Sequence, residues 1–360
     1  MRTFKIKEIS EIINGATPST SNPLYWDGSI PWITPKDLTD FHNRYINSGH
    51  SFITEEGYKS CSTKMLPIGT ILLSSRAPIG YLAIANKEMC TNQGFKSIIC
   101  NSQYINNLYM FYWLSTKINY LQQISSGATF KELSKDNLEN VEINLPTLAE
   151  QQHIVNTIGS VDDLLENLVK QNEKIIQIGL IKINKLNNIQ TKNLSEIVEF
   201  SKGCEVGSSN YSDIKKDNMI NYLRVGDLNA IGTTHVKLDN ELVISKFDDI
   251  LCAFDGAPGR NNIGLVGAYS SGIYNLKCND INKGLVYFGI NSDLNQKIIA
   301  DHSQGTTILH ASKSIQHLQY ADIGLEDKMY LNSLFKLLLQ NKKKIEYLKN
   351  IKSNLLNKYF

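Results

Sequence analysis

Apolar and polar positions along the chain follow two different periods, which alternate twice in the same order. Two stretches of about 140 residues mix short apolar runs with Gly, Pro, Ser and Asn, as is typical of strands joined by turns. Residues 68–73 and 249–252 are predicted to be buried strands, and residues 109–124 and 285–299 to be helices. After each stretch, apolar residues recur every three or four positions, which predicts a long amphipathic helix.

These changes of period divide the chain into four predicted segments. The first globular domain covers residues 1–147 and the first long helix residues 148–189, while the second domain covers 190–326 and the second helix 327–360. The length of 360 residues also favours more than one domain, because single hydrophobic cores rarely grow beyond about 250–300 residues. The predicted fold class is mixed α+β, with two tandem globular domains that are each followed by a long helix.

The two globular domains are predicted to be copies of one unit. Four matching segments occur in the same order in both halves, with only loop-sized changes in offset, which indicates a duplication. The matches are 6–15 with 194–203, 30–38 with 220–228, 126–129 with 304–307, and 138–145 with 318–325. Since the matched segments differ in most side chains, we expect the two copies to present different surfaces.

The two long helices are predicted to pair as an antiparallel coiled coil, because their apolar positions alternate spacings of three and four residues. The expected pairing residues are Leu165, Val169, Asn172, Ile176, Leu334, Leu338, Asn341, Ile345 and Leu348. Asn172 and Asn341 occupy equivalent positions, and a buried Asn in such a seam fixes the register of the helices. The alternative is that each helix packs only on its own domain.

Antiparallel pairing would hold the two globular domains apart in a pseudo-two-fold relation. A helix of about 38 residues extends about 57 Å. Dimeric DNA-binding proteins place two recognition units about one helical turn of DNA apart, and here one chain would carry both units. Because the copies differ, the expected target is a gapped and asymmetric DNA site, with the helices setting the length of the gap.

Several motifs resemble the target-recognition domain and spacer helix of type I restriction–modification specificity subunits. They are Gly-Ala-Thr-Pro-Ser at 15–19, Tyr-Trp-Asp-Gly at 25–28, Ile-Pro-Trp-Ile-Thr-Pro-Lys-Asp-Leu at 30–38, the strand and loop at 68–80, Asn-Leu-Pro at 144–146 and Glu-Gln-Gln-His-Ile at 150–154. The resemblance covers essentially the whole chain. The second half departs from the pattern, with Cys-Glu-Val-Gly at 204–207 in place of the first two motifs and no Leu-Pro or Gln-Gln before its helix.

The resemblance implies a non-catalytic, cytoplasmic subunit that binds double-stranded DNA and directs adenine methylation and restriction by its partners. The implied partners are two modification subunits, docked mainly on the long helices, and the restriction subunits. S-adenosylmethionine, ATP and Mg would be bound by those partners, so no cofactor or metal is expected on this chain.

Composition narrows the function classes further. The net charge of +2 gives no overall basic surface, so we expect a local one, or phosphate attraction supplied by a partner. No run approaches the ~20 apolar residues of a membrane helix, and the start of the chain lacks the apolar core of a secretory signal. No GxxxxGK[ST] phosphate loop and no Gly-rich methyl-donor motif is present. Two alternatives stay open: a fused methyltransferase or nuclease with an unrecognised site, and a coiled-coil scaffold with two protein-binding modules.

The candidate DNA contacts lie in predicted loops. Arg pairs well with guanine and Asn or Gln with adenine, while other polar contacts position the protein on the phosphates. The candidates are Thr34, Lys36, Arg76, Asn92, Gln93, Thr129 and Lys131 in the first half, and Arg224, Arg260, Asn261, Asn262, Thr307 and Lys313 in the second. Only five of 37 basic residues are Arg, and we expect Arg76 and Arg260 to read different half-sites. The alternative for each candidate is an exposed loop residue or a local ion pair.

Overall fold

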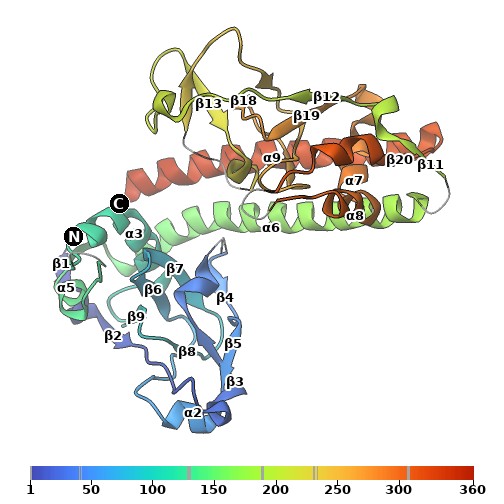
Figure 1. Cartoon of the computed structure of the whole chain (residues 1–360). Helices are drawn as coiled ribbons and strands as arrows, with labels where there is room; N and C mark the ends of the chain where they lie inside the picture. Colours follow the sequence, from blue (N-terminus) through green and yellow to red (C-terminus); the bar gives the residue numbers. More distant parts are fainter. Residues whose placement is uncertain are drawn as a thin grey trace. The chain divides into compact units, whose positions relative to one another are not determined.

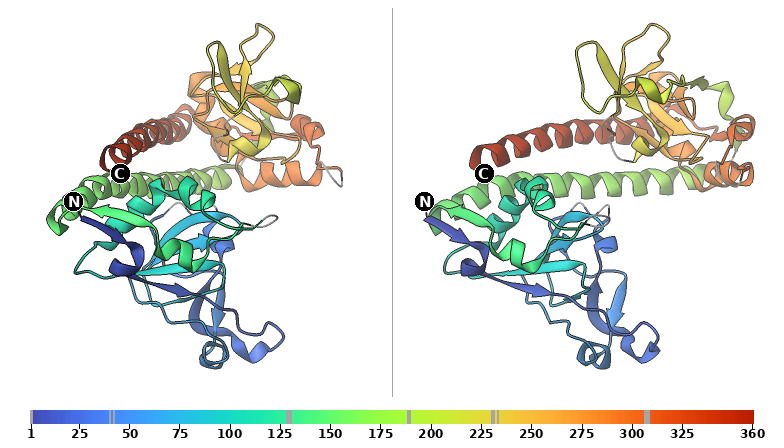
Figure 2. Two further views of the ribbon diagram at one scale, coloured as in Figure 1. Left: turned by 90° about the vertical axis from the view of Figure 1, so that its left-hand side faces the viewer. Right: turned by 60° about the vertical axis from the view of Figure 1, so that its left-hand side comes forward.

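The computed structural model describes residues 2–360 except 40, 42, 128–130, 188–189, 230–231, 233 and 306–308. The chain divides into two compact units, which comprise residues 1–166 with 349–360 (unit 1) and residues 167–348 (unit 2). Figures 1 and 2 show that each unit combines a β-rich module with parts of the two long helices, α6 (Leu148–Asn187) and α9 (Leu325–Tyr359). The mixed α+β class predicted from the sequence is therefore confirmed.

The module of unit 1 is built on a five-stranded sheet in the order β2-β9-β6-β7-β4. The neighbouring strands are antiparallel except for β4, which runs parallel to β7. The strands are β2 (Ser10–Asn14), β9 (Phe95–Cys100), β6 (Ile71–Ser75), β7 (Ile79–Ala85) and β4 (Tyr45–Ile46). A three-stranded sheet adds β5 (Ser51–Ile53), β3 (Trp26–Ile33) and β8 (Cys90–Thr91), and β1 (Arg2–Lys5) pairs with β10 (Glu142–Leu145) just before α6.

The module of unit 2 repeats most of this topology, but its main sheet lacks a counterpart of β4 and its second sheet has one strand more. Its main sheet has the order β12-β19-β16-β17, which matches β2-β9-β6-β7, and β13 again pairs with one antiparallel and one parallel neighbour. The main-sheet strands are β12 (Glu199–Lys202), β19 (Ile273–Lys277), β16 (Ile250–Ala253) and β17 (Asn261–Ile263). The others are β14 (His235–Lys237), β13 (Met219–Leu223), β18 (Gly267–Tyr269), β15 (Ile244–Ser245), and the pair β11 (Thr191–Asn193) and β20 (Gln319–Ala321). The duplication seen in the sequence is thus also present in the fold.

Two predicted helices are wrong in extent, because each is split in two. The helix expected at 109–124 consists of α3 (Asn107–Thr116) and α4 (Ile118–Gln123), and the helix expected at 285–299 consists of α7 (Lys283–Ile290) and α8 (Asp293–Asp301). In the second case Ser292 caps α8 through its side chain, which accepts a hydrogen bond from the backbone of Asn295. A side-chain cap of this kind satisfies a free N–H and starts a new helix.

Each unit has its own hydrophobic core, formed between the main sheet, a short helix and the long helices. In unit 1 the core joins Ile71 and Ile98 of the sheet, Met110 of α3 and Ile158 of α6, and the end of α9 packs against it. In unit 2 the core joins strands β16 and β19, helix α7 and both long helices. Burial of these apolar side chains, worth roughly 25 cal/mol per Å², holds each module on the helices.

The long helices α6 and α9 contact each other in antiparallel orientation, as predicted. In unit 2, Asn341 donates a hydrogen bond to Oδ1 of Asn172 at 2.9 Å, and Lys182 pairs with Asp327 at 2.6 Å. In unit 1, Lys352 pairs with Asp162 at 2.7 Å. Of the other expected pairing residues, Leu338 is buried, whereas Leu165, Ile176, Leu334, Ile345 and Leu348 are half-buried and Val169 is 43% exposed.

Candidate nucleic-acid interface

Several loops of unit 1 meet where β6 ends and β9 begins, and we call this surface rim 1. Ser75 donates to the carbonyl of Gly94 at 2.7 Å, and Leu133 donates to the carbonyl of Ser75 at 2.9 Å. Asn92 donates to the carbonyl of Ile33 at 3.0 Å, which adds the turn that follows β3. Rim 1 comprises residues 34–38, 76–78, 92–94, 126–127 and 131–132.

The same backbone contacts recur in unit 2 and define rim 2. Phe254 donates to the carbonyl of Gly272 at 3.0 Å, and Ala311 donates to the carbonyl of Phe254 at 2.7 Å. Ser270 donates to the carbonyl of Leu223 at 2.9 Å, as Asn92 does to Ile33 in unit 1. Rim 2 comprises residues 224–228, 254–260, 270–272, 304–305 and 309–310.

The repeated glycines at positions 15 and 203 bring a further loop to each rim. A Cβ on Gly15 would lie 2.1 Å from the carbonyl oxygen of Asn92, and one on Gly203 would lie 2.3 Å from that of Tyr269. Only glycine allows this approach. Beyond Gly15 the Thr17 hydroxyl meets Oε1 of Gln93 at 2.5 Å. In rim 2 the corresponding contact joins Ser271 to Glu205 at 2.9 Å.

Asp37 and Asp227 hold equivalent turns in the two rims. Oδ2 of Asp37 accepts hydrogen bonds from the backbone N–H and the hydroxyl of Thr34, both at 2.7 Å. Oδ2 of Asp227 accepts the backbone N–H of Arg224 at 2.8 Å. A Cβ on Gly49 would lie 2.7 Å from the carboxyl carbon of Asp37, so this carboxylate is packed against backbone. The sequence repeat contained both aspartates, but their role as turn clamps was missed.

In rim 1 the cationic side chains differ in whether they form ion pairs. Arg76 is half-buried in the β6–β7 loop and has no hydrogen bond or ion pair with the described residues, and Lys36 and Lys131 are exposed. Lys96, which is only 7% exposed on β9, pairs with Glu132 at 3.4 Å. Donors of this kind, free or weakly paired, are what phosphates and base edges require.

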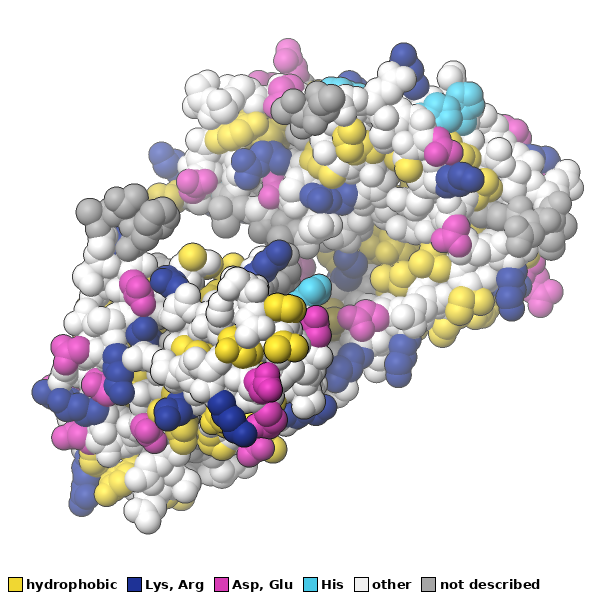
Figure 3. Space-filling view, turned by 60° about the horizontal axis from the view of Figure 1, so that its bottom comes forward, with side chains coloured by type: hydrophobic (Ala, Val, Ile, Leu, Met, Phe, Trp, Pro, Cys, Tyr) yellow, Lys and Arg dark blue, Asp and Glu magenta, His cyan; other side chains and the backbone are white. Residues whose placement is uncertain are grey.

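In rim 2 acidic side chains lie among the basic ones. Arg224 has a 51% exposed side chain and pairs with Asp227 at 3.5 Å, and His310 contacts Asp255 at 2.8 Å. Arg260 donates to the carbonyl of Val225 at 3.4 Å. The face drawn in Figure 3 also shows Lys and Arg interspersed with Asp and Glu rather than gathered in one field. The basic side chains Arg224 and His310 of rim 2 therefore each lie beside a carboxylate.

Not all candidate residues come together at the rims. Asn261 exchanges two 2.9 Å hydrogen bonds with Asn291, while Asn262 donates to Leu228 and accepts from Lys342, both at 2.6 Å. Both amides therefore support the module from within. Lys313 is exposed in the 3₁₀ helix Ser312–His317, just after the hairpin of rim 2. The candidates Thr129 and Thr307 lie outside the described residues.

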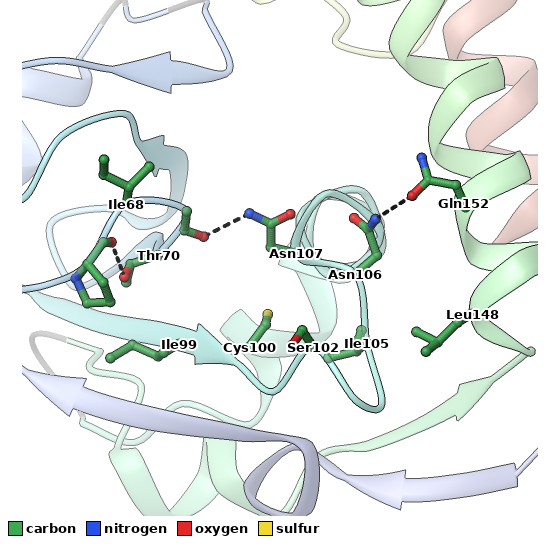
Figure 4. A pocket seen from close by; sticks show the side chains of 12 residues that line it. Ile68, Thr70, Ile99, Cys100, Ser102, Ile105, Asn106, Asn107, Leu148 and Gln152 are labelled. Carbon is green, nitrogen blue, oxygen red and sulfur yellow. Dashed lines mark hydrogen bonds between the residues drawn. The ribbon is translucent and has the colours of Figure 1, made fainter.

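A cavity lies at the other end of β6 from rim 1 (Figure 4), with a volume of about 420 Å³. Asn107 donates to the carbonyl of Gly69 at 3.1 Å, and Asn106 donates to Gln152 of α6 at 3.0 Å. A comparable cavity of about 460 Å³ occupies the same place in the fold of unit 2, next to Lys283. Because both modules have it, the cavity belongs to the repeated fold.

The described residues contain no cluster of metal-ligating side chains, and two of their thiols have raised pKa values. No group of three or more His, Cys, Asp or Glu in the described ranges could hold a metal ion. Burial raises the pKa of the Cys90 thiol to about 11 and that of Cys100 to about 12, so neither is a ready nucleophile. Within the part of the chain that the structure covers, no helix has the length and apolarity to cross a bilayer.

Comparisons with known proteins agree with this architecture. The family model of the type I restriction modification DNA specificity domain matches residues 1–177. The MjaIX specificity subunit of Methanocaldococcus jannaschii is 49% identical over 178 residues, which cover 49% of this chain and 41% of that protein. The EcoR124I/EcoR124II specificity subunit of Escherichia coli is 26% identical over 170 residues, which cover 45% of this chain and 41% of that protein. The matches thus span less than half the length of these relatives.

The fold as a whole also has a solved counterpart. The crystal structure of a type I restriction–modification S subunit from M. genitalium superposes with a TM-score of 0.60 at 19% identity, covering 100% of this chain and 96% of that one. The comparison shows that two β-rich modules with paired long helices are an architecture of this class. Residues 1–177 match the type I restriction modification DNA specificity domain, and the chain as a whole shares the fold of a solved type I restriction–modification S subunit.

Proposed function

We propose that this chain is a non-catalytic reader of a split DNA sequence, in which each module recognises one half-site. One observation carries the proposal: two copies of the same rim are built by the same backbone contacts but bear different side chains. A scaffold that only spaces two modules has no need for matched rims. A pair of readers with different half-sites needs both the common frame and the divergent side chains.

The recognition modules we propose are residues 1–147 and 190–326, with α6 and α9 as the ruler between half-sites. The antiparallel contacts within each unit, such as that between Asn172 and Asn341, support a fixed register of the helices. We further propose that the gap in the DNA site follows the length of the helices. Deleting matched heptads from both helices should then shorten the gap and leave the half-sites intact.

Partners of this reader would supply the catalysis. We propose that two modification subunits dock on the long helices, that restriction subunits join them, and that S-adenosylmethionine, ATP and Mg are bound by those subunits in the cytoplasm. Exposed apolar side chains on the helices support docking, because isolated surface helices rarely carry many of them. They are Leu164, Ile178, Ile181, Leu325, Met329, Tyr330, Leu337 and Tyr347.

Arg76 and Arg260 were expected to read different half-sites, and this assignment remains a proposal for both. Arg76 is the stronger candidate, since its guanidinium is not engaged by the described residues of rim 1. Arg260 donates to a backbone carbonyl of rim 2, which leaves fewer of its five donors for DNA. Single alanine variants that both keep the original methylation specificity would contradict the assignment.

The direct test is to map modified adenines in cells that express the chain together with a modification subunit. We expect one gapped, asymmetric site, and we expect a complex without this chain to leave that site unmodified. Binding of the complex to duplexes with and without the mapped site, measured over a range of salt concentrations, should show a specific component on top of the salt-dependent one. Equal binding to both duplexes at every salt concentration would overturn the proposal.

A further inference from the structure

Thr34 and Arg224 occupy the same backbone position in the two rims. Each residue directly follows a strand, β3 or β13, whose last carbonyl accepts a hydrogen bond from another loop of the rim. Each also caps a short 3₁₀ helix, Pro35–Leu38 or Val225–Leu228. Each backbone N–H is held by an aspartate three residues later. The two modules therefore present a hydroxyl and a guanidinium from one equivalent point, which makes this the sharpest chemical difference between matched rim positions.

The guanidinium of Arg224 is held on one side by a buried carboxylate. Asp227 is 7% exposed and accepts the Arg224 backbone N–H at 2.8 Å, while its Oδ2 lies 3.5 Å from Nε of the same residue. A carboxylate that holds both the backbone and the Nε edge directs the side chain and leaves the two terminal NH₂ groups for another acceptor. These groups form the bidentate donor pair that matches O6 and N7 of guanine.

An aromatic pair supports the guanidinium from a second direction. The Arg224 guanidinium carbon lies 5.9 Å from the ring centre of Tyr211, whose ring is 5.4 Å from that of the buried Tyr222. The hydroxyl of Tyr222 donates to the carbonyl of Cys204 at 2.9 Å, which fixes this ring. A guanidinium within about 6 Å of the centre of an aromatic ring is attracted to the face of that ring. Arg224 is thus half-exposed and oriented at the same time.

We propose that Arg224 reads a guanine in the half-site recognised by residues 190–326 (module 2). Residues 1–147 (module 1) make no guanine contact at the equivalent position, because Thr34 lies there. The inference rests on the proposed DNA-reading function and adds the base and the residue. Orientation before binding matters because a side chain that is already ordered loses less entropy when it binds. The neighbouring Arg260 donates to the carbonyl of Val225 in the same turn.

The test compares the methylation specificity of three complete complexes, which carry the wild-type chain, the Arg224→Lys variant or the Arg224→Thr variant. Lys keeps the charge but loses the bidentate geometry, so both variants should lose preference for one G·C pair. We expect a loss of about 5- to 150-fold, corresponding to one bidentate contact, in the half-site of module 2 only. Lys237→Gln, an exposed change on β14 outside the rim, is the matched control and should leave the pattern unchanged.

The outcomes separate this inference from the function beneath it. If wild-type complex gives no reproducible gapped site, the reading function itself fails. If the wild-type site is found and both variants keep its full base preference, only the assignment of Arg224 fails. Equal weakening at all sequences, with a salt slope smaller by about one, would identify a phosphate contact and would also overturn it. If Arg224→Thr does not fold, as judged by thermal unfolding, Arg224→Lys decides the test.

Discussion

The two modules share a topology and are both held on the long helices by apolar packing, but unit 1 adds a cluster of buried ion pairs. In unit 1, Arg44 is 7% exposed and meets three carboxylates of α6: Glu166 at 2.9 Å, Asp163, and Asp162 at 3.9 Å. Lys352 of α9 also pairs with Asp162. Burial disfavours the charge of Arg44, but hydrogen bonds to Glu166 and Asp163 outweigh it and raise the pKa of the guanidinium.

In unit 2 the attachment is apolar and uses close backbone packing. Leu331, Phe335 and Leu338 of α9 are at most 1% exposed and belong to the core of the module. A Cβ on Gly284 of α7 would lie 2.3 Å from the backbone of Leu331, so α7 and α9 touch through their main chains. Gly284 also donates to Oδ1 of Asn332 at 3.3 Å.

The two copies of the fold therefore share their backbone geometry but differ in the interactions that stabilise them. Apolar packing gives stability with little directional requirement, whereas a buried ion cluster adds little net stability but is costly to leave incomplete. We therefore expect unit 2 to depend on side-chain volume and unit 1 on the completeness of its ion pairs. Substitutions at Phe335, Arg44, Asn341 and Asp248 test this contrast between the two units.

Phe335→Ala should lower the free energy of unfolding by about 4 kcal/mol, the usual cost of deleting a buried aromatic ring. The loss should be insensitive to salt, because no charge is involved, and denaturant unfolding at two salt concentrations measures it. Tyr330→Ala on the same helix is the control, since Tyr330 is 44% exposed and surface changes usually stay within about 0.5 kcal/mol. Equal losses in the two variants would contradict the apolar attachment of unit 2.

Arg44→Gln should lower the free energy of unfolding by about 3 kcal/mol, because it removes a buried cation that contacts three carboxylates. Adding Glu166→Gln should recover part of the loss, since the second change removes one of the negative charges that then remain close together. A double-mutant cycle measures this coupling. Simple additivity of the two variants would show that Arg44 stabilises unit 1 through packing of its stem and not through the ion pair.

Asn341→Leu should destabilise unit 2 by about 1–3 kcal/mol, because the Asn172 amide loses its partner at a largely buried helix contact. The double variant Asn172→Leu with Asn341→Leu should regain this stability but give less uniform pairing of the helices. Unfolding curves test the first result, and the distribution of gap lengths among methylated sites tests the second. A double variant as unstable as the single one would speak against the hydrogen bond as the cause.

Asp248→Asn should give the smallest effect, one that depends on pH. The hydrogen bond from Lys283 lowers the pKa of Asp248 below its ordinary value. A carboxyl with a lowered folded-state pKa adds stability above its unfolded pKa of about 3.9 and loses it as pH falls through the folded value. The stability gap between wild type and variant should therefore be present at pH 7 and close as the pH falls through the lowered folded-state pKa of Asp248. A gap that persists at low pH would exclude ionisation as its source.

The sequence predicted the parts of this molecule that depend on local period. The heptads of α6 and α9 and the four repeated segments predicted the fold class and the duplication, because both patterns can be recognised from residues that are close together in the sequence. The splits at Lys117 and Ser292 were missed because the apolar pattern continues across both, and only the second is marked by a side-chain cap. Arg44 is one of five Arg in the chain, but its partners lie about 120 positions away and no local pattern indicates them.

The candidate site was predicted in outline but not in detail. The loops at Arg76, at Asn92 and Gln93, and at Arg224 come together at the rims because the repeat fixes which strand ends meet. Asn261 and Asn262 were selected for their base-pairing chemistry alone. Their amides instead satisfy buried partners within unit 2, and composition cannot distinguish an amide that faces DNA from one that completes its own module.

The division of the chain into units has a consequence for its biosynthesis. Unit 2 is one continuous segment, 167–348, whereas unit 1 needs residues 349–360 to cover the core begun by residues 1–166. Leu355, Leu356 and Tyr359 are among those last contributions. During synthesis, unit 2 can therefore complete its core once residue 348 has left the ribosome, whereas the core of unit 1 stays partly uncovered until residues 349–360 emerge. Chaperones that shield nascent apolar surface would be expected to engage the amino-terminal half during this interval.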